Sequence, residues 1–406
     1  MTVLDRRRFL QLGVAAALVP RARAATPLRV VVAGAGIIGA SAAMHLARAG
    51  ADVTVIDRAG PATHASRGSF AWINASWSKQ PQAYHSLNQA GVGGWRILQR
   101  ELKLPVRWGG SLEGNADVAF EGTLAERVAE QKAWGEKTRF VAGAELAALE
   151  PNVDFSSLRQ VVLSGNDGAT DPVASTRIFL DAASASGAKV SYPCELTGVS
   201  MANGRLKAVQ TSRGDIAADR LVLATGAAAD AARRFADFDF PQRDTPGATT
   251  LTAPMPRLVN RVLWLPGVHV HQRDDGRLVL GEDDGPPQND AHAARLAGHP
   301  NAFPSRELAL EHAERMRVLA QRYVPSLDKL DVEDVRICWR PMPLDGYPVL
   351  GASPARRDVY LAVTHSGVTL APIVGQYVAQ EIVDGELARS LQAFRPDRKF
   401  VATTGH

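Results

Sequence analysis

The sequence predicts an α/β fold with a second, α+β part, and two groups of observations support that prediction. Residues 28–59 hold a short valine-rich run, a glycine-rich turn, a helix-like stretch and a second apolar run, in that order. This order is typical of a β-α-β unit in a parallel sheet. Farther along, residues 268–281 are expected to form a β-hairpin and residues 306–323 an amphipathic helix. With 406 residues, the chain is long enough for two domains.

The chain opens with the pattern of an export signal. A charged head that includes Arg6 and Arg7 precedes an apolar run over residues 9–19, and residues 22–24 have the A-x-A form that a signal peptidase accepts. The run is too short to span a bilayer. The paired arginines, followed by Phe-Leu, resemble a twin-arginine (Tat) signal, and an uncleaved amphipathic N-terminus is the alternative. We therefore expect a signal peptide over residues 1–24, the Tat export machinery as a partner, and a periplasmic or secreted protein.

Charge and cysteine content narrow the classes of function. The chain has 46 basic and 42 acidic residues, a net charge of +4, and residues 1–24 hold five Arg and one Asp, which accounts for the whole excess. The mature chain is therefore neutral, and we expect no nucleic-acid partner. Two cysteines, Cys194 and Cys338, are too few for a disulfide framework, although an exported protein could pair them.

The glycine-rich unit predicts a dinucleotide site. Gly34, Gly36 and Gly39 form G-x-G-x-x-G directly after the first apolar run. The first glycine permits the tight turn, the second lets a pyrophosphate approach the backbone, and the third allows close packing of the helix, whose N-terminus attracts phosphate. The second run ends at Asp57, the position that binds a ribose hydroxyl. A glycine-rich turn without a ligand would not need Asp57; this unit alone leaves NAD and FAD open.

Four stretches outside that unit decide the cofactor by resemblance. They are residues 66–69 (SRGS), 219–226 (DRLVLATG), 345–351 (DGYPVLG) and 364–372 (THSGVTLAP). In order and spacing they resemble the FAD-dependent D-amino acid oxidase family, which includes glycine oxidase and sarcosine oxidase, over nearly all of the mature chain. Thr364 stands where the family usually has Gly. The resemblance implies FAD and a glutathione-reductase-type fold, in which a Rossmann-like FAD-binding domain carries an inserted substrate domain with an antiparallel sheet.

The resemblance also implies how the chain divides. The FAD-binding domain would combine residues 25–85, 166–245 and 336–406, and the substrate domain residues 86–165 and 246–335. Together with the glycine motif, the resemblance places the cofactor against Gly34, Gly36, Ile37, Ile38, Gly39, Asp57, Arg58, Ser66, Arg67, Gly68, Ser69, Leu196, Thr225, Gly226, Cys338, Gly367, Val368 and Thr369. The helix expected from Gly367 would aim its N-terminus at the flavin N1–C2=O edge, where reduction adds negative charge. The alternative is that it is only the last core helix.

Two side chains are candidates for acting on the substrate. Arg340, five residues before Asp345, matches the position at which glycine oxidase binds the substrate carboxylate, and its planar fork suits that group. An interdomain salt bridge is the alternative. His269 and His271 alternate on one strand and share a face. The resemblance puts that sheet over the substrate pocket, so His269 is a catalytic candidate, and sheet surface is the alternative. No third ligand is evident, so no metal site is predicted.

Cys338 is a candidate for a covalent bond to the flavin. It precedes Asp345 by seven residues. This matches the spacing at which monomeric sarcosine oxidase carries the cysteine that is bonded to its flavin. The alternative is a small buried cysteine without reactivity.

The function implied by the resemblance is an exported FAD-dependent oxidoreductase. It would oxidise the C–N bond of a small amino acid or secondary amine by hydride transfer to flavin N5, and O2 or a quinone-linked acceptor would take the electrons. No general base is evident, and none is needed if the protein orients the reactants and stabilises charge. Two alternatives stay open: an FAD-dependent 2-hydroxy acid dehydrogenase and a non-catalytic flavin redox carrier, which would have no need for Arg340.

Overall fold

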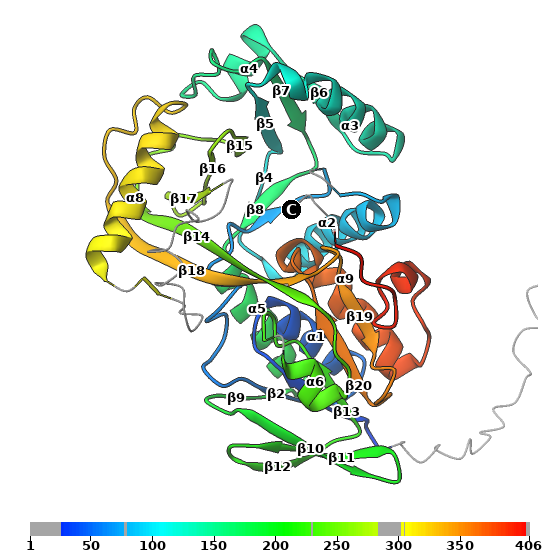
Figure 1. Ribbon diagram of the computed structural model, residues 1–406. Helices are drawn as coiled ribbons and strands as arrows, with labels where there is room; N and C mark the ends of the chain where they lie inside the picture. Colours follow the sequence, from blue (N-terminus) through cyan, green and yellow to red (C-terminus); the bar gives the residue numbers. More distant parts are fainter. Residues whose placement is uncertain (1–25, 77–78, 229, 283–301, 304, 403–406) are drawn as a thin grey trace, which may run out of the picture.

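The chain folds into two parts built on separate sheets. The computed structural model describes residues 26–402 except 77–78, 229, 283–301 and 304. The predicted signal peptide lies outside the described residues. Figure 1 shows a lower part built on a parallel sheet and an upper part built on a second large sheet, with long strands between them. The predicted fold class, a Rossmann-like domain joined to a sheet-based second domain, is confirmed. The residue bounds proposed for the two domains stay a prediction.

The lower part is centred on a six-stranded sheet. Its strands, in spatial order, are β19 (Val349–Ala352), β20 (Val359–Val363), β13 (Arg220–Leu223), β1 (Arg29–Ala33), β2 (Asp52–Ile56) and β9 (Lys189–Ser191). All neighbours are parallel except β19 and β20. Val30 and Val32 join one core cluster and Val31 the other, so both faces of β1 are buried. This double burial explains why β1 is a continuous valine run.

Closely packed helices cover one face of this sheet. They are α1 (Ile37–Arg48), α2 (Gln82–Leu102), α5 (Pro172–Ala185) and α9 (Gly367–Ala379). α1 lies against α5 and α9, and α9 lies against α2. A Cβ at Gly375 would lie 2.4 Å from Ser41 Oγ, and a Cβ at Gly91 would lie 2.4 Å from Thr369 O. Glycines therefore allow the close approach of α1, α9 and α2.

The opposite face of the parallel sheet is covered by smaller elements. They are α6 (Asp230–Ala236) and the antiparallel strands β10 (Leu196–Ala202), β11 (Arg205–Thr211) and β12 (Gly214–Ala217). Their buried residues, among them Val209, Phe235 and Leu206, join Val31 and Leu221 in one cluster. This layer completes the three-layer arrangement that a parallel sheet requires.

The upper part is built on an eight-stranded sheet. In spatial order the strands are β18 (Val332–Pro343), β14 (Gln242–Pro254), β17 (Arg277–Glu282), β16 (Val268–Gln272), β15 (Val262–Leu265), β5 (Ser111–Asn115), β7 (Gln160–Ser164) and β6 (Thr138–Phe140). β16 and β17 form the predicted hairpin, and α8 (Arg306–Gln321), the predicted amphipathic helix, covers the sheet. The sheet is mixed rather than purely antiparallel because β15 and β5, which come from distant segments, pair in parallel.

Long and short strands connect the two parts. β14 and β18 pair antiparallel over their length, and Figure 1 shows both running from the upper sheet toward the parallel sheet. A small sheet between the parts contains β3 (Trp72–Ile73), β8 (Gly168–Thr170) and β4 (Val106–Trp108), and the outer edge carries α3 (Glu121–Ala133) and α4 (Gly143–Leu149). β18 therefore carries residues from the second sheet to the edge of the first.

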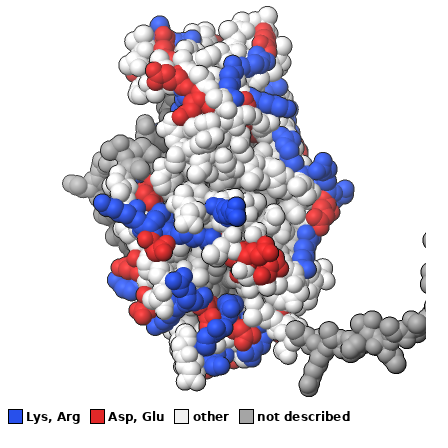
Figure 2. Space-filling view, turned by 90° about the vertical axis from the view of Figure 1, so that its right-hand side faces the viewer, with Lys and Arg blue, Asp and Glu red and all other residues white. Residues whose placement is uncertain are grey.

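Charges of both signs share the surface on one side of the molecule. Figure 2 shows Lys and Arg interspersed with Asp and Glu over the face that it presents. Over residues 26–402, apart from the gaps named above, no helix is both long and apolar enough to cross a membrane.

Candidate active site

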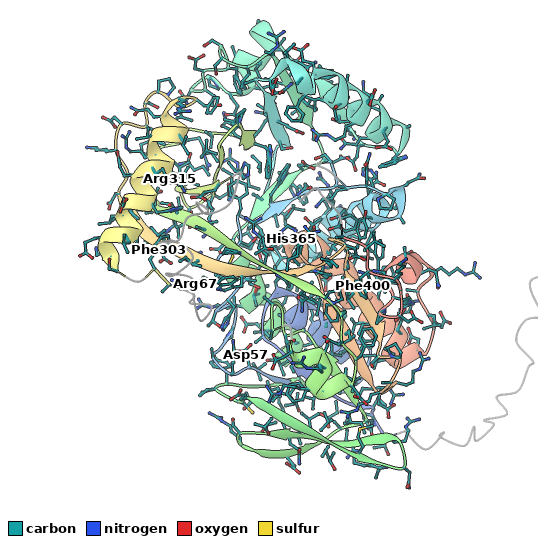
Figure 3. The ribbon with its side chains drawn as sticks, in the orientation of Figure 1. Asp57, Arg67, Phe303, Arg315, His365 and Phe400 are labelled. Atoms are coloured by element: carbon teal, nitrogen blue, oxygen red, sulfur yellow. The ribbon has the colours of Figure 1, made fainter. Side chains whose placement is uncertain are left out.

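A cleft of about 730 Å³ lies along the carboxyl ends of the parallel strands. Ala33, Asp57 and Ala224 at the ends of β1, β2 and β13 line it, and Thr364 lines it after β20. Because β1 lies between β2 and β13, the cleft opens where the strand order reverses, which is where ligands bind in open parallel sheets. The position therefore indicates a ligand site. Figure 3 shows Asp57 in the lower part and His365, another lining residue, near the centre of the molecule.

Asp57 holds two loops at one end of the cleft. One carboxylate oxygen accepts a hydrogen bond from the backbone N–H of Ala35 at 2.8 Å. The other accepts from the N–H groups of Ala59 and Gly60, each at 2.8 Å. A carboxylate has about four acceptor sites, so Asp57 still has an acceptor site for a hydroxyl group in the cleft.

The three motif glycines sit in positions that a side chain would obstruct or crowd. Gly34 has φ +112°, and a Cβ there would lie 2.3 Å from Ala224 O. A Cβ at Gly39 would lie 1.9 Å from Gly34 O, so this glycine allows α1 to pack on the turn. A Cβ at Gly36 would lie 3.2 Å from Ser66 Oγ. At this turn, backbone atoms without a covering side chain therefore line the cleft.

The first turn of α1 lies at the wall of the cleft. The first four N–H groups of a helix have no partner within it. Ile37 N–H donates to Ser66 Oγ at 3.0 Å, and Gly36, Ile37 and Ile38 all line the cleft. This end of α1 suits an anionic group such as a pyrophosphate.

On the second sheet, Arg340 is half-buried and lies close enough to His269 for its charge to act on that ring. Among the side chains that the structure describes, no carboxylate lies within ion-pair distance of Arg340, so the predicted alternative of an interdomain salt bridge gains no support. A Cβ at Gly247 would lie 2.9 Å from Arg340 Nε, which shows that a glycine makes room for the guanidinium. Arg340 does not line the 730 Å³ cleft itself.

The two histidines of β16 are buried neutral rings. His271 Nε2 lies 2.7 Å from Phe70 O, to which it donates, and the His269 ring stacks on Trp264 with centroids 3.3 Å apart. Burial, aided by the charge of Arg340, lowers the pKa of His269 to about 3, and burial also lowers the pKa of His271 to about 3. Neither ring is charged near neutral pH. Within the described ranges, no cluster of metal-ligating side chains occurs.

A family model described as "DAO: FAD dependent oxidoreductase" matches residues 29–381. The chain belongs to this family. A glycine oxidase of Bacillus licheniformis is 24% identical over 382 residues, which cover 91% of this chain and 97% of that protein. Among solved structures, a glycine oxidase from Geobacillus kaustophilus has a TM-score of 0.81 at 19% identity, covering 92% of this chain and 100% of its own. An L-proline dehydrogenase from P. horikoshii has a TM-score of 0.78 at 22% identity, covering 91% and 97%.

As a member of this FAD-dependent family, the protein is an enzyme that uses FAD, and the cleft fits that cofactor. Asp57 suits the ribose and the first turn of α1 the pyrophosphate. Thr364 Oγ is buried beside the cleft without a hydrogen-bond partner in the described part of the chain. A buried hydroxyl without a partner is costly, and a polar group of the cofactor would satisfy it. Away from Asp57, the cleft is lined by His365, just before α9, and by Gly367 and Val368 in its first turn.

Most of the predicted cofactor residues line this cleft. They are Gly34, Gly36, Ile37, Ile38, Asp57, Arg58, Ser66, Ser69, Leu196, Thr225, Gly226, Cys338, Gly367 and Val368. Further lining residues that were not predicted from the sequence include Thr63, His64, Glu195 and Arg234. Glu195 lies close to the end of β9, and Thr63 and His64 follow β2. Because ligands of parallel sheets bind at strand ends, these positions in the sequence could have indicated that the three residues lie near the cofactor.

Four predicted residues do not line the cleft but hold its wall. Gly39 packs under the glycine turn, as described above. Arg67 forms an ion pair with Asp334 at 2.6 Å. Thr369 Oγ donates to Trp72 O, at 3.2 Å. A Cβ at Gly68 would lie 2.5 Å from Cys338 Cβ, so Gly68 lets β18 approach the cofactor loop. Direct cofactor contact for these four stays a prediction.

We expect FAD to be held without a covalent bond to Cys338. Cys194 and Cys338 are both buried and unpaired. Cys338 lines the cleft, but burial raises the pKa of its thiol to about 11, and the thiol donates to Gly68 O at 3.4 Å. The thiolate is the reactive form of cysteine, so this site does not favour attack on the flavin. Acid precipitation should leave the yellow colour in the supernatant. A coloured pellet that Cys338→Ala makes colourless would instead establish the covalent bond.

Proposed function

We propose that the protein oxidises the C–N bond of a small amino acid or secondary amine, with FAD as electron acceptor and Arg340 binding the substrate carboxylate. The observation that supports this is the state of Arg340. It is a half-buried guanidinium with no carboxylate in ion-pair distance among the described side chains, and Gly247 leaves space around it. A buried charge is costly unless it is paired, and a substrate carboxylate would provide the pair.

The groups near Arg340 orient the substrate rather than exchange protons with it. His269 is neutral and stacked on Trp264, and the Trp264 ring lies 5.3 Å from the Trp72 ring. These rings form an apolar surface that restricts the substrate and keeps water away. Bound FAD supplies the acceptor for the hydrogen that leaves the substrate carbon as hydride. The substrate amine enters as the neutral form, so the chain needs no strong base.

Two alternative functions, oxidation of a 2-hydroxy acid and electron transfer without turnover, have less support. A 2-hydroxy acid also carries a carboxylate and would use Arg340 in the same way. The relatives favour an amine, because similar proteins are named glycine oxidase, L-proline dehydrogenase and iminodiacetate oxidase. A redox carrier without turnover would have no use for a half-buried arginine beside the aromatic rings.

The deciding experiment is anaerobic bleaching of the bound flavin. The holoenzyme is mixed with panels of D-amino acids, L-amino acids, N-methyl amino acids and 2-hydroxy acids. Bleaching by an amino acid or secondary amine, with an oxo acid or aldehyde as product, supports the proposal. Bleaching by hydroxy acids alone would replace it by the second function, and no bleaching by any panel would refute the proposed substrate class. Repeating the best case in air separates O2 from a quinone-linked acceptor.

We also propose that the protein is exported through the Tat pathway, on the basis of Arg6, Arg7 and the A-x-A site at residues 22–24. Replacing Arg6 and Arg7 by lysine keeps the charge but removes the paired arginines. The variant should accumulate in the cytoplasm with its FAD bound, as fractionation and flavin absorbance would show. Undiminished export of the variant would point to a general secretory signal instead.

A further inference from the structure

A buried lysine, Lys79, is held at the N-terminus of α9. Lys79 precedes α2 and is only 9% exposed. Its ammonium donates to Ser366 Oγ at 3.0 Å, and Ser366 is the N-cap residue of α9. The hydroxyl of Tyr84, on α2, lies 2.7 Å from the same Ser366 Oγ. α2 and the segment before it therefore place a cation at the start of α9.

No carboxylate in the described part of the chain forms an ion pair with this ammonium. Asp167 acts on Lys79 through its charge, but it is not within ion-pair distance. Asp167 Oδ2 instead accepts hydrogen bonds from Trp72 Nε1 at 3.1 Å, Ser76 Oγ at 2.7 Å and Ser111 Oγ at 2.6 Å. Lys79 thus remains a buried cation without a contacting anion, a costly arrangement that is typical of functional sites.

The other titratable groups around Lys79 are few. Those that act on it or belong to the same buried cluster are Asp167, His85, Glu136 and Tyr84. His85 Nε2 lies 3.7 Å from Glu136 Oε1. Burial lowers the pKa of Lys79 to about 8 and raises the pKa of Asp167 to about 7. Near neutral pH, Lys79 is therefore mostly an ammonium, and it becomes a neutral amine above about pH 8.

Lys79 lies next to the end of the cleft that takes the flavin. His365 and Gly367, on either side of Ser366, both line the cleft. Asp57 and the turn of α1 would hold the ribose and pyrophosphate of FAD at the other end, so the flavin would lie toward α9. Reduction makes the flavin more negative, and a nearby cation stabilises that state.

We propose that Lys79 is a positioning residue which, through Ser366, raises the reduction potential of the bound flavin and can take up a proton when the flavin is reduced. Hydride transfer delivers two electrons and one proton, so the cofactor gains one negative charge. The ammonium offsets that charge. When Lys79 starts as a neutral amine, it binds one proton from solvent in the same reduction. The inference goes beyond the proposed function, because it applies to any reductant, including dithionite.

The test measures the flavin itself, without a substrate. Lys79→Met removes the charge at similar length and should weaken sulfite binding to the oxidised flavin about tenfold or more. Sulfite binding leaves negative charge on the flavin, as reduction does. A tenfold change in a two-electron equilibrium corresponds to about 30 mV, so the midpoint potential should fall by at least that amount. Lys79→Arg should stay within about threefold of wild type. Lys132→Met, on the exposed side of α3, is the matched control and should change neither quantity.

The pH dependence of the wild-type potential provides a second, independent measurement. Lys79 is already protonated below about pH 8 and takes up a proton on reduction above it. The midpoint potential should therefore fall with pH more steeply above pH 8 than below it, and the difference between the two slopes should be about 30 mV per pH unit. Ser366→Ala should also weaken sulfite binding, but by a smaller factor than Lys79→Met.

Two results would overturn the proposal. One is a folded, FAD-loaded Lys79→Met variant with wild-type sulfite affinity and potential. The other is a wild-type potential without the break near pH 8, which decides the matter even if Lys79→Met does not fold. Neither measurement uses an amine. Failure of the amine panels would therefore leave this inference intact, and failure here would leave the proposed function intact.

Discussion

Replacing Arg340 by Met is expected to lower kcat/KM for the best carboxylate substrate by about 10³-fold. Removing one partner of a buried, hydrogen-bonded charge pair costs about 2–5 kcal/mol, and each 1.36 kcal/mol is a factor of about ten in rate. For the same amine without its carboxylate, the loss should be less than about tenfold. Arg340→Lys keeps the charge but loses the planar two-pronged fork, so it should restore only part of the rate.

Two controls separate recognition of the carboxylate from stability. Arg277, on β17 of the same sheet, forms ion pairs with Asp275 and Glu333, and Arg277→Met should leave both rates unchanged. FAD content and thermal unfolding of Arg340→Met should match wild type, because no carboxylate among the described side chains is paired with Arg340. Equal losses on the two substrates would show that Arg340 serves the structure instead of the substrate.

The glycine-rich unit was predictable because the residues that define it are close together in the sequence. Gly34, Gly39 and Asp57 lie within 24 residues of one another, and each occupies a position that backbone geometry or hydrogen bonding restricts. The valine run of β1 indicates a strand that is buried on both faces, and such a run can be recognised from a few consecutive residues. The hairpin of β16 and β17 was likewise predictable, because its two strands are adjacent in the chain.

Features that depend on distant contacts were not predictable in the same way. Nothing in the sequence around Lys79 indicates burial, because the burial arises only when α2 packs on α9 and Ser366 comes within 3.0 Å of the ammonium. The sequence placed His269 and His271 on one face but not the stacking of His269 on Trp264, which needs the neighbouring strand β15. The parallel pairing of β15 with β5 joins segments about 150 residues apart, which no local pattern specifies.

Replacing Asp57 by Ala is expected to yield protein that loses FAD during purification. The carboxylate accepts from the N–H groups of Ala35, Ala59 and Gly60, so the change leaves three backbone donors without that acceptor and also removes the expected ribose contact. A hydrogen bond to a charged group contributes about 1.5–3 kcal/mol, and the ribose contact alone would change the Kd for FAD about 10- to 100-fold. Disorder of the two loops should weaken binding further.

Titration of apo-protein with FAD, followed by flavin fluorescence, measures this effect directly. Asp57→Asn keeps one acceptor oxygen in nearly the same shape and should retain more affinity than Asp57→Ala, because the two loops are still partly joined. Asp215→Ala, at an exposed position of β12, is the control and should bind FAD as wild type does. Wild-type affinity in Asp57→Ala would place the adenosine ribose elsewhere in the cleft. Asp57 would then only join the turn after β1 to the turn after β2. A lower melting temperature of Asp57→Ala would reveal that structural role.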